Sequence, residues 1–291
     1  IAGRLGIKIG LERFDALGRE TPMLVDLKPS GQHYMQELHA AGGFSRIRAE
    51  LRDHLDLDCL SVDGMTQRDL LEAAPEFAQD VVRPLADPLY TSGSMAVLKG
   101  NLCPDGAVIK QAAASERLLR HEGRAVVFEN VEDLARRIDD PNLEVDEDDV
   151  LIMRNAGPIG APGMPEAGYL PIPKKLASKG VKDMVRISDA RMSGTAFGTI
   201  VLHVAPEAAA GGPLALARTG DLVRLDVPAR RLDLLVDDAE LERRRRQAAE
   251  ASAKPSRPAR GYARLLHDEI LQAPEGCDFR FLRGRNEPSE G

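Results

Sequence analysis

The first 90 residues combine a short apolar run with stretches of helical periodicity. The run "PMLVDLK" is followed by Pro-Ser-Gly, which is typical of a strand that leads into a turn. Apolar residues at helical spacing come next, with Ser30 and Thr66 as expected helix caps. The expected elements are a strand at 22–28 and helices at 31–41, 44–55 and 67–74. This pattern predicts an α/β arrangement for the first part of the chain.

From about residue 90 the pattern changes to short apolar pieces separated by Gly, Pro, Asn and Asp. Such punctuation indicates a domain boundary and a more β-rich architecture beyond it. The expected strands lie at 124–129, 149–155 and 183–189, and the expected helices at 131–140, 173–180 and 261–273. We therefore expect two domains, at 1–90 and 91–291.

One stretch of the second part, residues 221–236, alternates strictly. Val223 and Leu225 point to one side and Arg224 to the other, and Pro228 interrupts the pattern. The stretch predicts a half-buried hairpin or a sheet corner.

The amino-acid composition limits the classes of protein to which the chain can belong. The chain has 291 residues, of which 43% are hydrophobic, so it can bury a large core. The net charge is −7 and no basic stripe is interleaved with aromatic residues, which argues against nucleic acid as the main partner. No stretch approaches the roughly 18 apolar residues of a membrane span, and no signal-peptide pattern opens the chain. We expect a cytoplasmic protein with no membrane partner.

The cysteines and the charge runs carry little chemistry by themselves. Cys59, Cys103 and Cys277 lie far apart, which suits neither a disulfide framework nor a metal-binding knuckle, so we expect reduced thiols. The acidic run at 144–149 and the basic run at 243–246 are expected to be solvated surface. The opening "IAGRLGIKIG" reads like the interior of a domain, and we expect a fragment whose N-terminal part is missing.

The loop "GPIGAPGMPE", residues 157–166, invites a phosphate-binding interpretation because its glycines recur. Three prolines remove backbone donors that a phosphate loop would aim at its ligand, so we set that interpretation aside. The loop is instead stiff and follows an expected strand, which would hold Glu166 as a ligand for a hard cation such as Mg²⁺. The spacing alone favours a surface glutamate after a turn.

Ser193, in "DARMSGTAFGT", has three interpretations. A hydrolase nucleophile needs Gly two residues earlier, where Arg191 stands, and no acid and histidine follow in a convincing order. A cap or turn serine is the commonest use of a Ser-Gly pair. A general base would have to ionise a hydroxyl of pKa about 15.7, which costs about 12 kcal/mol at pH 7 and requires adjacent cations. A basic Ser193 therefore implies a metal site beside it.

Several motifs together resemble one family. "VDLKPSG", "GNLCPDGAVIK", "GPIGAPGMPE", "DARMSGTAFGT", "HVAPEAAAGGP" and "VPARRLDLLV" are similar to the dihydroxy-acid and sugar-acid dehydratases, which include phosphogluconate dehydratase. The resemblance runs from Ile1 to about Gly284. Within the family, the tract after the serine and the tail "EGCDFRFL" look more like the aldonate dehydratases that act on arabinonate or xylonate.

The resemblance implies a reaction and its residues. A small-molecule sugar acid would lose water to give a 2-keto-3-deoxy acid, with an iron–sulfur cluster, expected as [2Fe-2S], and Mg²⁺ as cofactors. Ser193 matches the family's base, Thr195 a hydroxyl beside it and Glu166 a magnesium ligand. The cluster ligands would belong to the missing N-terminal part, since no cysteine of this chain occupies a cluster motif. The fragment alone is expected to be inactive.

The resemblance also implies a fold and an assembly. We expect the end of an α/β cofactor-carrying domain, followed by a swivelling β-barrel-like β/β/α domain with flanking helices, and a homodimer or homotetramer. Two alternatives stay open: a branched-chain dihydroxy-acid dehydratase, and a non-catalytic module that keeps the fold.

Overall fold

The computed structural model describes residues 1–72, 79–164, 170–193, 196–250 and 257–284. The chain forms two compact units, one of Ala16–Ser94 and one of Ile1–Asp15 with Met95–Gly291. Helix α1, Leu11–Glu20, contributes residues to both units. The assignment of domains to 1–90 and 91–291 stays a prediction.

The regular elements described in the Ala16–Ser94 unit are helices. Its helices are α2 (Met35–Ala40), α3 (Gly43–Glu50) and α4 (Gln67–Glu72). Its small core holds Leu24, Leu38 and Val82. The Asp69 amide donates to Thr66 Oγ1 over 3.1 Å, which confirms the predicted cap of α4.

Two predictions for this unit are wrong. Residues 22–28 form isolated bridges and no regular strand. Ser30 does not cap the following helix, because the chain first makes a turn in which the His33 amide donates to the Asp26 carbonyl and the Gln32 amide to the Asp26 carboxylate. Helix α2 therefore begins only after Tyr34.

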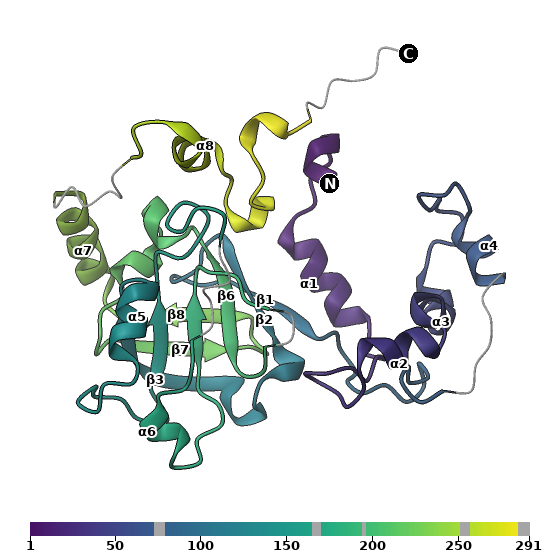
Figure 1. Ribbon diagram of the computed structural model, residues 1–291, viewed down its shortest axis with the longest axis horizontal. Coiled ribbons are helices and arrows are strands. Elements are labelled where there is room, and N and C mark those ends of the chain that lie inside the picture. The colour runs from purple at the N-terminus through teal and green to yellow at the C-terminus, as the bar shows by residue number, and fades with distance from the viewer. Residues whose placement is uncertain (73–78, 165–169, 194–195, 251–256, 285–291) are drawn as a thin grey trace. The chain divides into compact units, whose positions relative to one another are not determined.

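The larger unit is built on one eight-stranded sheet (Figure 1), in the order β1-β2-β6-β5-β4-β3-β7-β8. The strands are β1 (Met95–Leu98), β2 (Gly106–Lys110), β3 (Arg120–Phe128), β4 (Val150–Met153), β5 (Arg186–Ser188), β6 (Ile200–Ala205), β7 (Leu222–Asp226) and β8 (Arg231–Leu234). A bridge between Lys99 and Arg231 brings the two edges together. The sheet is thus nearly closed into a barrel, which confirms the expected barrel-like α/β fold.

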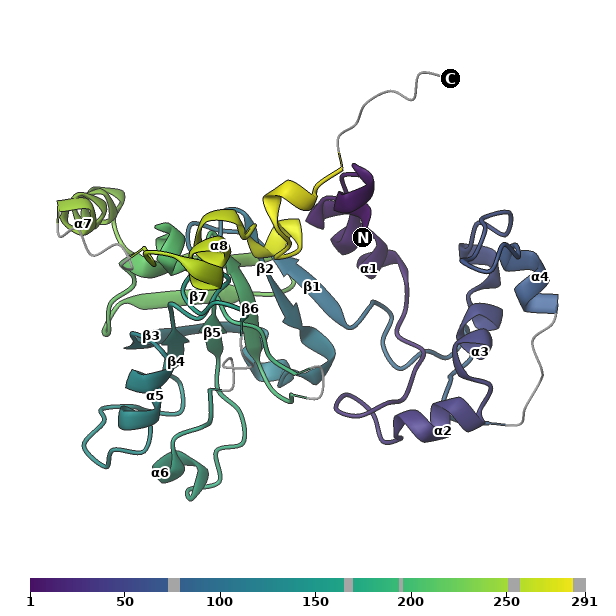
Figure 2. The same cartoon turned by 45° about the horizontal axis from the view of Figure 1, so that its top comes forward.

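Strands β3, β4, β5 and β6 are parallel neighbours, while β1, β2, β7 and β8 pair antiparallel. The short strands β4 and β5 lie at the centre of the parallel part (Figure 2). The predicted hairpin at 221–236 is confirmed as β7 and β8, with Val223 and Leu225 buried and Arg224 exposed. Antiparallel strands with one solvated face produce this alternation.

Strand β4 reads as a continuous apolar run because both of its faces are buried. Ile152 of β4 packs in the core inside the sheet, whereas Leu151 and Met153 pack with Leu134 and Leu176 from the helices outside. The helices described in this unit after β3 are α5 (Val131–Arg137), α6 (Lys174–Ala177), α7 (Asp238–Glu250) and α8 (Gly261–Glu269). No helix among the described residues is long and apolar enough to cross a bilayer.

Candidate active site at the carboxyl ends of the parallel strands

The loops that carry the predicted site residues leave the same edge of the sheet. Because β4 and β5 are parallel neighbours, their carboxyl ends lie side by side. The loop after β4 contains Glu166 in its sequence, and the loop after β5 contains Ser193. Ligands bind outside the carboxyl ends of parallel strands in open α/β sheets and in closed α/β barrels, so the position suits a catalytic site.

Ser193 is exposed to solvent in the loop between β5 and β6. Its carbonyl oxygen accepts a hydrogen bond of 3.1 Å from the Ala196 amide. Glu166 and Thr195 lie outside the described residues, so the joint placement of the three predicted side chains stays a prediction. An exposed serine at the carboxyl edge is accessible to a small-molecule substrate.

A buried carboxylate, Glu207, organises the first part of the glycine-proline loop. Its oxygens accept hydrogen bonds of 2.9–3.1 Å from the amides of Ile159 and Gly160, and one of 2.7 Å from Gln272 Nε2. A Cβ at Gly157 would lie 2.6 Å from Glu207 Oε2, so only glycine fits there. Two inward amides of the loop thus bind a carboxylate of the chain itself, which agrees with setting the phosphate interpretation aside.

A second buried carboxylate, Asp189, ties the ends of β4, β5 and β6 together. It is 1% exposed and accepts hydrogen bonds from the amides of Asn155 (3.2 Å), Ala156 (2.9 Å) and Ala208 (2.9 Å). Burial raises the pKa of Asp189 to about 6 against the effect of these amides, and the charge of Glu207 adds to the increase. Asp189 and Glu207 are therefore structural anchors for the loops.

A direct contact joins the serine loop to the glycine-proline loop. Arg191 Nε donates to the Met164 carbonyl over 2.7 Å. Arg191 comes two residues before Ser193 in the sequence, and Met164 comes two residues before Glu166. The segments that directly precede the two predicted site residues are thus in contact.

His203 occupies an irregular position in β6. Its φ is 55°, and the register of β2 against β6 shifts between Gly106 and Val108 beside it, as at a β-bulge. Its Nδ1 is buried and has no hydrogen-bond partner among the described residues. Burial lowers the pKa of His203, and the charge of Arg191 lowers it further. The imidazole is therefore neutral at pH 7.

The described residues do not assemble a ligand set for either expected cofactor. Among them, no three His, Cys, Asp or Glu side chains come together as a metal site. Burial raises the pKa of Cys103 to about 12 and that of Cys277 to about 11, and Cys59 is exposed in the other unit. Cluster ligands are thiolates, so the buried thiols of Cys103 and Cys277 do not fit an iron–sulfur cluster.

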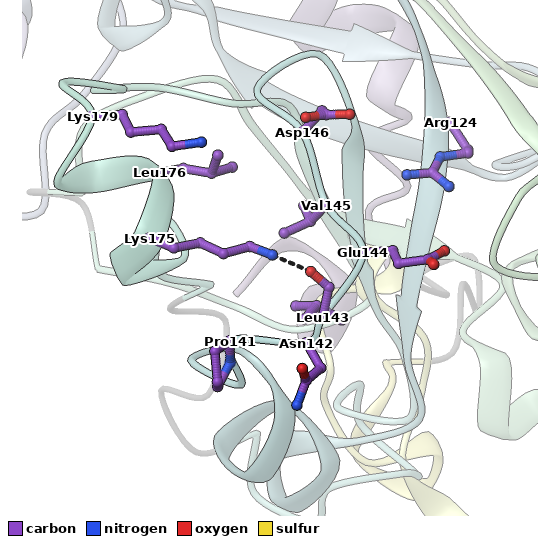
Figure 3. A pocket seen from close by; sticks show the side chains of 10 residues that line it. All are labelled: Arg124, Pro141, Asn142, Leu143, Glu144, Val145, Asp146, Lys175, Leu176 and Lys179. Atoms are coloured by element: carbon purple, nitrogen blue, oxygen red, sulfur yellow. Dashed lines mark hydrogen bonds between the residues drawn. The ribbon is translucent and has the colours of Figure 1, made fainter.

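A cavity of about 510 Å³ lies at the opposite end of the parallel strands (Figure 3). Residues 141–146, which precede β4, line it together with Lys175 and Lys179. The Lys175 ammonium donates to the Leu143 carbonyl across it. Because these segments lead into the amino ends of the strands, the cavity is distinct from the serine loop.

Sequence reasoning missed Asp189, Glu207 and the contact of Arg191. A signal for the two acids exists: each follows an expected or observed strand within two residues, in "RISD" and "VAPE". An acidic residue at the carboxyl end of a buried strand can accept from the amides of neighbouring loops. The acceptor of Arg191 is a backbone carbonyl, which every residue has, so the sequence does not indicate this contact.

Two models of one protein family match the chain. The family model described as dihydroxy-acid/6-phosphogluconate dehydratase C-terminal matches residues 80–277, and the corresponding N-terminal model matches residues 1–70. An L-arabonate dehydratase of Azospirillum brasilense is 49% identical over 99% of the chain and 51% of its own length. A 6-deoxy-6-sulfo-D-gluconate dehydratase of Pseudomonas putida is 50% identical over 97% of the chain and 49% of its own length.

A dihydroxy-acid dehydratase of Methanothrix thermoacetophila (strain DSM 6194 / JCM 14653 / NBRC 101360 / PT) is more distant, at 42% identity over 89% of the chain and 46% of its own length. The chain thus spans about half the length of these relatives. Each of these relatives is named as a dehydratase. The chain belongs to the dihydroxy-acid/6-phosphogluconate dehydratase family.

Proposed function

We propose that the protein dehydrates a sugar acid, an aldonate such as arabinonate or xylonate, to the 2-keto-3-deoxy acid. The observation that supports this choice is the ranking of the relatives by their sequence identity to the chain. Two relatives named for sugar acids are 49% and 50% identical to the chain, and the named dihydroxy-acid dehydratase is 42% identical. The activity is proposed for the full-length natural protein that carries this sequence.

Ser193 is proposed as the base, with Thr195 as a hydroxyl beside it. The Ser193 alkoxide takes the proton from C2, and the electron pair of the C2–H bond forms a C2=C3 double bond. The C3–O bond breaks, and the departing hydroxide becomes water by taking up a proton. The enol then gains a proton at C3, loses the proton of its C2 hydroxyl and becomes the ketone.

Glu166 is proposed as a ligand of Mg²⁺. This ion and a [2Fe-2S] cluster stay the expected cofactors on the family resemblance. Since the described residues hold no assembled ligand set for either, no step of the reaction is assigned to them. The cytoplasmic location and the homodimer or homotetramer also stay predictions.

The substrate class can be tested with the full-length natural protein. Arabinonate, xylonate and 2,3-dihydroxyisovalerate are supplied separately, and formation of the keto acid is followed. We expect rapid turnover of an aldonate. Turnover of dihydroxyisovalerate alone would establish the branched-chain alternative, and folded, cofactor-loaded protein that converts none of them would support the non-catalytic module.

The role of Ser193 can be tested separately by Ser193→Ala. Loss of a general base typically lowers kcat by about 10²–10⁴-fold. Ser178→Ala is the control. Ser178 is exposed and directly follows α6, and among the described residues its hydroxyl hydrogen-bonds only to the Lys175 carbonyl, over 3.2 Å. Activity of Ser193→Ala within a few fold of the control would dismiss the assignment.

A further inference from the structure

A buried arginine in β5 contacts the far ends of both site loops. Arg186 is 4% exposed, and its Nη1 donates to the Leu170 carbonyl over 3.1 Å while its Nη2 donates to the Phe197 carbonyl over 3.2 Å. In the sequence, Leu170 follows Glu166 and Phe197 follows Ser193, each by four residues. One guanidinium thus joins the two chain segments just beyond the proposed ligand and the proposed base.

Asp183 fixes the orientation of this guanidinium. Its Oδ1 accepts from Arg186 Nη2 over 2.9 Å, and its oxygens also accept from the Thr199 amide and hydroxyl and from the Ser115 amide. Burial raises the pKa of Asp183, but these hydrogen bonds and the Arg186 charge outweigh it and hold the pKa below its ordinary value. The pair is fully charged at neutral pH, and its hydrogen-bond donors point in fixed directions.

The end of the serine loop is built around the arginine. Gly198 has a φ of 115°, and a Cβ there would lie 1.9 Å from Arg186 Nη2. Only glycine allows the chain to pass so close to the guanidinium. The path of the loop therefore depends on where this side chain lies.

The contact at the near ends of the loops completes the arrangement. Arg191 links Met164 to the serine loop before the two site residues, and Arg186 links Leu170 to Phe197 after them. Two loops that are joined at both ends cannot shift independently of each other. The two arginines thus hold the described ends of the two loops together.

We propose that Arg186 is a positioning residue that holds the Ser193 loop at a fixed distance from the loop containing Glu166. The proposal rests on the proposed function, which gives these two residues their roles. Lysine is a poor substitute, because its ammonium is a single charged point and lacks the planar fork that reaches two carbonyls and a carboxylate at once. Arg186→Lys therefore keeps the buried charge and removes the link between the loops.

Hydrogen exchange of the 291-residue chain tests the link without any cofactor. In Arg186→Lys, amides in the peptides spanning 157–172 and 191–200 should exchange about tenfold faster, as expected when a charged hydrogen bond is lost. Arg244→Lys is the matched control: Arg244 is 8% exposed, donates to the Leu216 carbonyl and pairs with Asp221 on α7's side of the unit. That variant should leave both loop peptides unchanged.

Two exchange results would overturn the proposal. One is unchanged exchange of both loop peptides in Arg186→Lys, and the other is an equal increase in Arg244→Lys, which would indicate general loosening. If Arg186→Lys does not fold, Asp183→Asn provides the same test, because it removes the negative charge that orients the guanidinium and leaves the arginine in place. It should give the same pattern with a smaller increase, and the absence of that pattern would also overturn the proposal.

Kinetics of the full-length natural protein test the consequence. Misplacing a catalytic group by about 1 Å can cost about 10²-fold, so Arg186→Lys should lower kcat by roughly 10- to 100-fold with little change in KM, while Arg244→Lys stays at the wild-type value. An unchanged kcat in the presence of faster loop exchange would overturn the positioning role. A fully active Ser193→Ala would instead defeat the proposed function, and the exchange experiment would still decide whether Arg186 holds the loops.

Discussion

The buried Asp189 makes a pH-dependent contribution to stability that its surroundings define. Its carboxylate is 1% exposed and accepts hydrogen bonds from the amides of Asn155, Ala156 and Ala208. Burial nevertheless raises its pKa to about 6 from the value of 3.8 for an exposed aspartate, and the neighbouring charge of Glu207 acts in the same direction. The folded protein therefore retains this proton to a higher pH than the unfolded chain does.

The sign and size of the effect follow from that difference. Below the unfolded pKa both states are protonated, so the stabilising contribution of Asp189 is fully present. It is lost as the pH rises through the folded pKa of about 6, because the unfolded chain releases the proton first. With about 1.36 kcal/mol for each pKa unit, the loss amounts to about 3 kcal/mol.

Asp189→Asn isolates this contribution because asparagine does not titrate. The urea concentration at the midpoint of unfolding is measured at several values from about pH 4 to about pH 7. Unfolding is followed by the loss of hydrogen-exchange protection in peptides that cover β4 and β5. The free energy of unfolding of the wild type minus that of the variant should fall by about 2–3 kcal/mol over this range. The same difference for Asp183→Asn should be flat, since the pKa of Asp183 lies below the range. A flat difference for Asp189→Asn would refute the argument.

Two further predictions concern close contact and thiol chemistry. Gly198→Ala should destabilise the chain by at least about 2 kcal/mol more than Gly220→Ala, because both glycines have positive φ but only the first Cβ would meet Arg186; equal melting temperatures would contradict this. A thiol reagent at about pH 8 should label the exposed Cys59 in the native chain and reach the buried Cys103 only after unfolding, as mass spectrometry of the peptides would show; early labelling of Cys103 would contradict its burial.

Periodicity predicted the sheet better than the helical unit. The hairpin at 221–236 and the strands at 149–155 and 183–189 have patterns that burial imposes directly, on one face or on both. The expected strand at 22–28 failed because its pairing depends on a few isolated bridges to distant residues. The hydrophobic pattern of a short segment does not indicate which distant residues will pair with it.

Charge runs were the least predictable part of the sequence. The basic run at 243–246 was expected to be solvated, yet Arg244 is buried against Asp221 and Glu240. The acidic run at 144–149 likewise ends in the buried Asp149, which pairs with Arg124. A charged side chain is buried where a distant partner compensates it, and that partner is set by the tertiary fold. Arg186 escaped the sequence reasoning because two of its acceptors are backbone carbonyls outside its strand, those of Leu170 and Phe197.

At the carboxyl edge of the sheet, the residues that anchor the loops differ from the residue proposed to react. Asp189 and Glu207 are buried and occupied by amide donors, whereas Ser193 is exposed. Making that hydroxyl basic at pH 7 costs about 12 kcal/mol. A guanidinium such as Arg191, even at about 4 Å, would return only about 4 kcal/mol near a protein surface. The remaining 8 kcal/mol or so exceeds what one arginine supplies, so a basic Ser193 requires a stronger positive centre, which is the physical reason for proposing Glu166 as a magnesium ligand.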